Sequence, residues 1–337
     1  MTEQMRSGPL SPDEAPEMTS GPADPALYHF HRPSLEELRT AAALPSHTAT
    51  GLTNEAILAE IEAGRLKPEW SCIATSDDGD LMGRAMWWGR DGKVPIALDI
   101  WDAAPGISDP TNVLAGLLGH GRALLEEAGA QSPLPHPLRV PVGWRDSAEI
   151  AESVHLKMQV ASDNGLGRAN ERLQFQWDQG GMVPPSPARL SFVPASDEVF
   201  TRLFAEAATG SLDVMTAREL EEMSATDLAR EEIDYYLSCP GERSWWRVAQ
   251  THDGEIIGLA IPSATPTNRN VGYLAVLPQH RGHGYVDEIL AFITRFQIED
   301  GAERITATTD AVNTPMASAF VRAGYTLVEV RIDLEGS

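Results

Sequence analysis

A short loop with two closely spaced glycines and an arginine is the part of this sequence best suited to bind a ligand. The loop spans residues 279–284, Gln-His-Arg-Gly-His-Gly, after an apolar run over 271–277 that Pro278 ends. Residues 285–300 follow it with apolar side chains at helical spacing. The pattern therefore predicts a strand, a glycine turn and a helix.

The chemistry expected of this turn is phosphate binding. Gly282 and Gly284 allow backbone conformations closed to other residues and let a ligand approach the amides. The first N–H groups of a helix have no partner within the helix and favour an anion. Arg281 is expected to add a planar positive charge beside them. Because glycines at such turns also serve geometry alone, the interpretation depends on a second motif.

The second motif occupies residues 313–325 and predicts a short helix that a glycine closes. Together the two motifs resemble motifs A and B of the GCN5-related N-acetyltransferases (GNAT), Q/R-x-x-G-x-G/A and N-x(10)-G-F/Y. The matching residues are Gln279, Gly282 and Gly284 in the first motif and Asn313, Gly324 and Tyr325 in the second.

The resemblance implies an α/β (α+β) fold in which a mixed, mostly antiparallel sheet is flanked by helices. It also implies acetyl-CoA as cosubstrate, no metal, and a backbone N–H of Val276 that meets the thioester carbonyl. By the same resemblance, the residues that bind coenzyme A are Leu274, Ala275, Val276, Gln279, Arg281, Gly282, His283, Gly284, Tyr285, Asn313 and Phe320.

Two catalytic positions of the family differ in this sequence. Many members carry a tyrosine, the general acid, seven residues after the motif B asparagine, where this chain has Phe320. The family's glutamate base near the start of the fourth strand is also missing, since residues 268–270 are Asn-Arg-Asn. Asp310 is the remaining hypothesis for an amine or water relay, with helix capping as its alternative.

The expected elements recur in the same order in two halves of the chain. Residues 78–79 and 253–254 are Asp-Gly turns between two strands. Gly129 and Gly301, at nearly the same offset, each end a helix. We therefore predict two tandem GNAT folds. The boundaries are a disordered tail over 1–26, a degenerate N-terminal copy over 27–178, a linker over 179–188 and a C-terminal copy over 189–337.

The first copy lacks the motifs that bind coenzyme A. Residues 102–108 read Asp-Ala-Ala-Pro-Gly-Ile-Ser where the glycine turn should be, and the motif that begins at Asn170 has no closing glycine. We expect this copy to be a scaffold that shapes one wall of the substrate cleft.

The acceptor is expected beneath a helix over residues 216–237, where the family resemblance places it. Tyr235, Tyr236 and Trp246 are candidates to line its pocket, with core packing as the alternative for each. The tandem arrangement is similar to mycothiol synthase and antibiotic-modifying acetyltransferases, which favours a small-molecule primary amine, such as a secondary metabolite or antibiotic, acetylated by direct attack in a ternary complex. A protein or peptide N-acetyltransferase and a non-catalytic acyl-CoA-binding module remain the alternatives.

Composition restricts the partners and the compartment. The formal net charge of −23 argues against nucleic acid as a partner. No apolar run reaches the roughly 18 residues of a membrane span. The two cysteines, Cys72 and Cys239, have no disulfide or zinc spacing and suit a reducing compartment. We expect a cytoplasmic monomer or homodimer.

Overall fold

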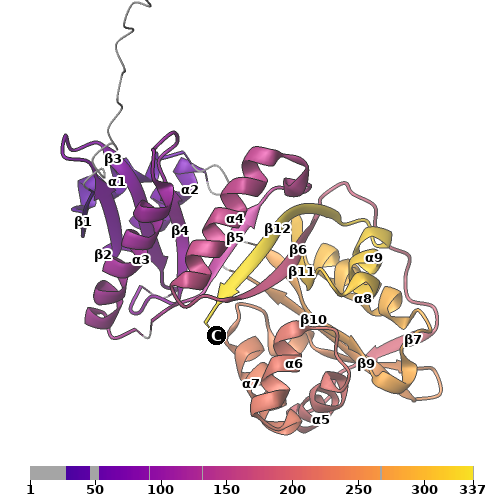
Figure 1. Ribbon diagram of the computed structural model, residues 1–337. Helices are drawn as coiled ribbons and strands as arrows, with labels where there is room; N and C mark the ends of the chain where they lie inside the picture. The colour runs from indigo at the N-terminus through magenta and orange to yellow at the C-terminus, as the bar shows by residue number, and fades with distance from the viewer. Residues whose placement is uncertain (1–27, 46–52, 91, 131, 266–267, 337) are drawn as a thin grey trace, which may run out of the picture.

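The two halves of the chain repeat one order of helices and strands. The computed structural model describes residues 28–45, 53–90, 92–130, 132–265 and 268–336 (Figure 1). The first half contains β1 (His29–His31), α1 (Leu35–Ala42), α2 (Asn54–Glu62), β2 (Leu66–Thr75), β3 (Leu81–Trp88), β4 (Ala97–Ala103), α3 (Pro110–Glu127), β5 (His136–Val140), α4 (Ala148–Asp163) and β6 (Arg168–Asp178). The second contains β7 (Leu190–Val193), α5 (Asp197–Ala208), α6 (Val214–Glu222), α7 (Ala225–Ser238), β8 (Arg247–Thr251), β9 (Ile256–Ala264), β10 (Arg269–Val276), α8 (Tyr285–Glu299), β11 (Arg304–Asp310), α9 (Thr314–Arg322) and β12 (Thr326–Glu335). The order confirms the expected tandem repeat, with three helices after β7 where the first half has two after β1.

The helix expected over residues 216–237 is two helices. α6 ends at Glu222, and Ser224 begins α7 by accepting a hydrogen bond from the backbone N–H of Asp227. A serine in that position satisfies a helix-start donor and so ends continuous helical spacing. No helix in the described part of the chain is both long and apolar enough to cross a membrane.

The last strand of each half lies in the other half's sheet. Among the described residues, a four-stranded sheet has the order β1-β2-β3-β4, and an eight-stranded sheet has the order β5-β12-β6-β11-β10-β9-β8-β7. Thus β12 pairs with β5 of the first half, and β6 pairs with β11 of the second. Figure 1 shows β12 and β6 running together between the two halves. We call β11, β6 and β12 the central strip.

The exchanged strands also exchange core residues. Val330, Ile332 and Leu334 of β12 are buried in the core of the first half with Leu138 and Val140 of β5. Apolar residues therefore alternate along β12, and its apolar face serves the first half. The predicted domain boundaries at residues 178 and 189 agree with the order of the elements. The eight-stranded sheet and the core of the first half, however, contain residues from both sides of these boundaries, so the division into domains stays a prediction.

Strands β10 and β11 separate soon after they meet. Their parallel pairing joins Arg269 and Asn270 to Ile305 and Thr306. Beyond that point a bulge bends β10 at Gly272, which has a φ of +69°, a conformation that favours glycine. The two strands therefore diverge, and the divergence opens one side of the sheet.

We predict that replacing Ile332 by alanine loosens the first half of the fold. The side chain is 3% exposed, and truncation of such a buried residue costs about 2–5 kcal/mol. Amide hydrogen exchange in β5, distant in sequence, should accelerate. Val328→Ala is the control, since Val328 is 44% exposed on the same strand. Unchanged exchange in β5 would contradict the exchange of core residues.

Candidate functional site

A cleft of about 1030 Å³ opens where β10 and β11 diverge. One end meets the glycine turn before α8, and the other lies against α6 and α7. Arg172 of β6 and Arg331 of β12 form part of a further wall. Of the residues expected to bind coenzyme A, those that line the cleft are Leu274, Ala275, Val276, Arg281, Gly282, Gly284, Tyr285, Asn313 and Phe320.

The glycine turn presents an uncapped helix start to the cleft. Gly282 and Gly284 have φ values of +81° and +74°, which favour glycine. Gly284 is the N-cap of α8, and no side chain caps this end of the helix. The first N–H groups of α8 are thus left for an anion, and the helix dipole favours one there. The turn fits a coenzyme A pyrophosphate.

The N–H of Val276 faces the cleft. The next residue, Leu277, donates its N–H to Ile257 of β9 at 2.9 Å. Because successive N–H groups of a strand point to opposite sides, that of Val276 points away from β9, toward the gap between β10 and β11. The orientation is that required of a donor to a thioester oxygen.

The side chain of Arg281 is engaged with the protein. Its guanidinium donates to the carbonyl oxygens of Ala207, Thr209 and Gly210 at the end of α5, at 2.7–2.9 Å. These are orphan acceptors of a helix C-terminus. The expected phosphate-binding fork is therefore wrong for this side chain, which fixes α5 against the turn.

A different arginine lies beside the turn. Arg189 donates to the carbonyl oxygen of His283 at 3.0 Å and lies 4.5 Å from the centre of the Tyr285 ring. Its partner is Glu288. Neither His283 nor Gln279 lines the cleft, and the Gln279 amide donates to Glu206. Arg189 is far from the glycine turn in sequence, so the motif alone could not predict that it lies there.

Motif B supports the floor of the cleft. Asn313 is the N-cap of α9 and accepts a hydrogen bond from the N–H of Met316 at 3.3 Å. Phe320 is 2% exposed and stacks on Phe175 of β6, with ring centres 5.0 Å apart. It therefore contributes packing where the family tyrosine would contribute a hydroxyl.

Tyr325 does not replace the missing hydroxyl. Its O–H lies 2.9 Å from the Thr294 hydroxyl in the core, and burial raises its pKa above the ordinary value. Tyr273, in contrast, lines the cleft, and burial raises its pKa as well. Tyr273 therefore has a hydroxyl at the cleft, and the raised pKa keeps that hydroxyl protonated at neutral pH.

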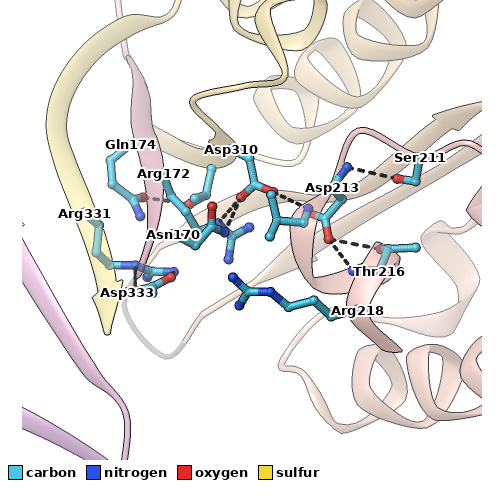
Figure 2. Close-up of polar contacts among 12 residues, drawn as sticks. Asn170, Arg172, Gln174, Ser211, Asp213, Thr216, Arg218, Asp310, Arg331 and Asp333 are labelled. Carbon is cyan, nitrogen blue, oxygen red and sulfur yellow. Dashed lines mark hydrogen bonds and ion pairs between the residues drawn. The ribbon is translucent and has the colours of Figure 1, made fainter. Parts of the chain in front are cut away.

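Asp310 holds the fold in place instead of relaying a proton. It is 1% exposed, and its carboxylate accepts from the Asn170 amide at 3.0 Å and from the Val214 N–H at 2.6 Å (Figure 2). Arg172 lies 3.1 Å from it. The relay expected of Asp310 is therefore wrong, because donors surround it and it does not line the cleft. The alternative of capping the following helix is wrong as well, because Asn313 caps α9. Asp310 instead accepts from the first N–H of α6, whose N-cap is Asp213.

The expected acceptor residues divide between cleft and core. Tyr235 and Tyr236 line the cleft, and the Tyr236 hydroxyl donates to the Gly272 carbonyl at 3.4 Å. Trp246 is 2% exposed and packs on Phe200 away from the cleft. The expectation for Trp246 is therefore wrong, and its alternative of core packing holds.

The residue that sequence reasoning missed is Glu232 of α7. It lines the cleft and makes no hydrogen bond or ion pair with any other residue that the structure describes. Burial, and then the charges of Glu219 and Asp213, raise its pKa to about 7. It precedes Tyr236 by one helical turn and so shares its face. The four-residue spacing from Tyr236, a predicted pocket residue, could have indicated Glu232 from the sequence.

Comparison with known families assigns the second half of the chain. Residues 189–326 match the model of the acetyltransferase (GNAT) domain. The second half of the chain thus matches a GNAT domain. This family consists of acyltransferases that use acetyl-CoA. Comparison with curated proteins gives no match.

Two solved structures with TM-scores above 0.5 agree in fold, and a third is similar at a lower score. A GCN5-related N-acetyltransferase from Sphaerobacter thermophilus is 15% identical, with a TM-score of 0.55 over 92% of this chain and 95% of that one. The glucosamine N-acetyltransferase region of a fungal multi-domain β-N-acetylglucosaminidase is 14% identical, with a TM-score of 0.52 over 92% of this chain and 38% of that one. A tandem GNAT protein from the clavulanic acid pathway is 16% identical, with a TM-score of 0.43 over 91% and 97%.

The first copy has a closed helix start where the GNAT domain has an open one. Asp109 is the N-cap of α3 and accepts from the N–H of Asn112 at 3.0 Å, and Pro110 follows it. A carboxylate already occupies the place of an anion there, and proline removes one N–H. The helix that corresponds to α9 is α4, with Ser147 as its N-cap, so the expected comparison at Asn170 fell on a strand.

We predict that coenzyme A binds once per chain. Of the two corresponding helix starts, that of α8 has no side-chain cap, whereas Asp109 caps that of α3. Isothermal titration calorimetry of the full chain should give one site. Two sites of similar affinity would show that the first copy also binds.

We predict that Gly284→Val weakens acetyl-CoA binding by about 100-fold or more. The branched side chain disturbs several hydrogen bonds to a charged group, each worth about 1.5–3 kcal/mol. Gly301→Val is the matched control, because Gly301 has a φ of +88° at the other end of α8 and carries the same strain of about 1–3 kcal/mol. Equal affinities of the two variants would show that the turn is only structural.

Proposed function

We propose that this protein transfers the acetyl group of acetyl-CoA to the primary amine of a small molecule. The observation that carries the proposal is Glu232, an unpartnered carboxylate with a raised pKa, in the same cleft as the Val276 N–H and the open start of α8. Acyl transfer to an amine needs a base, an oxyanion donor and a bound thioester. The cleft supplies a group for each need.

Glu232 is the general base in this mechanism. An amine arrives largely as ammonium near neutral pH and must lose a proton before it attacks. A carboxylate whose pKa is about 7 accepts that proton more readily than one with an ordinary pKa. Asp213 and Glu219, whose charges raise that pKa, also favour a cationic acceptor at this end of the cleft.

Val276 binds the developing negative charge through its N–H while the start of α8 holds the pyrophosphate. Acetyl-CoA supplies the activated acetyl group as a thioester. No general acid is required of Phe320, because a thiol with a pKa of roughly 8.5 is a tolerable leaving group as thiolate. Tyr273 lines the cleft and is the hydroxyl to be tested if protonation assists departure of the thiolate.

Helix α6 makes the acceptor end suitable for a small molecule. Its N-terminal N–H at Val214 is bound by Asp310, and Arg218 pairs with Glu335 at 3.1 Å. The two partners of α6, Asp310 and Glu335, lie on strands of the central strip, so α6 is attached to the sheet and forms a wall of the cleft. A fixed wall over the acceptor favours a compact amine over a protein surface.

The test of the proposed function is thiol release from acetyl-CoA by the purified full chain with a panel of small amines and peptides. Release with small amines at rates well above hydrolysis supports the proposal. Preference for peptides would favour a protein N-acetyltransferase. Coenzyme A binding without release for any amine would leave an acyl-CoA-binding module.

We predict that Glu232→Gln lowers kcat by about 10²–10⁴-fold, the usual contribution of a general base. In the wild type, kcat/KM should rise with pH through about 7, because the base acts only when deprotonated. The variant should lose that rise. Asp234→Asn is the control, since Asp234 is an exposed carboxylate on the same helix outside the cleft. A pH profile unchanged in Glu232→Gln would remove Glu232 from the mechanism.

A further inference from the structure

A row of charged side chains crosses the central strip. Arg172 of β6 lies opposite Asp310 of β11 on one side and opposite Arg331 of β12 on the other. Residues directly opposite on neighbouring strands project from the same face of a sheet. The row therefore lies on one face, and Figure 2 shows its members together with the start of α6.

That face is the acceptor side of the cleft. The Val214 N–H at the start of α6 reaches Asp310 on it, and Thr308, two residues before Asp310, lines the cleft. The opposite face of β6 carries Phe175 in the core against α8 and α9. The two arginines thus look toward the side where α6 and α7 lie.

Two arginines directly opposite each other are unfavourable unless anions balance them. Asp310 lies 3.1 Å from Nε of Arg172, and Asp333 lies 2.7 Å from Nε of Arg331 and accepts a hydrogen bond from one of its terminal nitrogens at 3.0 Å. These are the ion pairs that the two arginines form with residues the structure describes. Neither Nε forms a hydrogen bond within the described part of the chain, so Asp310 balances Arg172 by charge alone.

Both terminal nitrogens of Arg172 and one of Arg331 form no hydrogen bond with a residue that the structure describes. The side chains of Arg172 and Arg331 are 23% and 27% exposed, and both residues line the cleft. These nitrogens can donate to the two oxygens of one planar carboxylate. The part of the cleft wall formed by Arg172 and Arg331 can therefore bind a group with a single negative charge.

We infer that the acceptor is an amino acid-like zwitterion whose carboxylate binds Arg172 and Arg331 and whose amine faces Glu232. This inference rests on the proposed function and names its substrate class. The arginines lie on the central strip, Glu232 lies on α7 and all three line the same cleft, so each charge of a small zwitterion can meet an opposite charge there. A doubly charged phosphate is disfavoured, because Asp310 and Asp333 lie directly behind the arginines.

The inference gives the first half of the chain a part in recognition. Arg172 belongs to β6, the last strand of the first copy, and reaches the cleft of the GNAT domain only because the last strands are exchanged. The acceptor site is thus composed of residues from both copies.

The test compares amines that differ only in the carboxylate. Thiol release from acetyl-CoA is measured with β-alanine, γ-aminobutyrate and lysine, and with the carboxamide of each. The wild type should prefer the carboxylate in at least one pair by about 10- to 100-fold in kcat/KM, as expected for hydrogen bonds to a charged group.

The variant Arg331→Gln should abolish that preference by lowering kcat/KM for the carboxylate member. Arg331→Lys, which keeps the charge but loses the planar fork, should retain only part of it. Arg304→Gln is the matched control: Arg304 is also a strand arginine, paired with Asp178 at 2.9 Å, and lies outside the cleft. Acetyl-CoA affinity and melting temperature establish that each variant is folded.

Two outcomes overturn the inference, and they are distinguishable. Release with equal kcat/KM for carboxylates and carboxamides, or an equal loss for both in Arg331→Gln, contradicts the carboxylate site while acetyl transfer itself stands. No release with any amine, while acetyl-CoA still binds, contradicts the proposed function and removes the inference with it.

Discussion

The exchange of β6 and β12 between the two halves is the constraint on which the rest of the structure depends. Because a strand projects successive side chains to opposite faces, each exchanged strand serves two purposes. On β6, Phe175 enters the core of the GNAT domain while Arg172 faces the acceptor side of the cleft. On β12, Ile332 enters the core of the first half. Moving either strand would therefore remove a core residue and a wall of the cleft together.

The charges of the site are arranged against a strongly acidic background. With a formal net charge of −23, the protein repels an anionic cosubstrate at long range. Attraction is left to short-range donors, chiefly the open N–H groups at the start of α8. Near Glu232, burial first and then the charges of Glu219 and Asp213 raise the pKa of that carboxyl to about 7. The excess of negative charge thus opposes the cosubstrate and adds to the effect of burial on the base.

Local signals in the sequence predicted the elements that bind coenzyme A. The apolar run, Gly284 and the spacing of α8 are all short-range features, and the structure has each where it was expected. The partners of side chains were not predictable in this way. Arg281 binds carbonyls at the end of α5, and Asp310 binds the start of α6; both partners are distant in sequence.

Strand exchange was also beyond the sequence, for a physical reason. The alternation in β12 predicts which residues are buried, but it is the same whichever strand lies beside it. Two other features could have been predicted from the sequence: the break between α6 and α7, and the position of Glu232 on the cleft side of α7. Ser224 has the character of a helix start, and Glu232 shares a helix face with Tyr236.

In the first copy, a few contacts connect β4 and β5, the strands that correspond to β10 and β11, although the two belong to different sheets. There, the N–H of Leu98 on β4 donates to the Pro135 carbonyl at 2.8 Å, and the His136 ring donates from Nδ1 to the Leu98 carbonyl at 2.7 Å. Arg139 of β5 pairs with Asp99 of β4 at 2.8 Å. Burial lowers the pKa of His136 to about 3, so the ring is neutral and this contact persists at physiological pH.

Capping of α3 removes one feature that the second copy uses to bind coenzyme A, because Asp109 already occupies that helix start. In the GNAT domain β10 and β11 pair at Arg269 and Asn270 and then diverge, and the Val276 N–H faces the opening. In the first copy the corresponding strands β4 and β5 belong to different sheets and are connected by the contacts of Leu98, His136 and Arg139. These contacts attach β5 to the first half, and β12 pairs on β5. The first copy thereby places the central strip for the other copy.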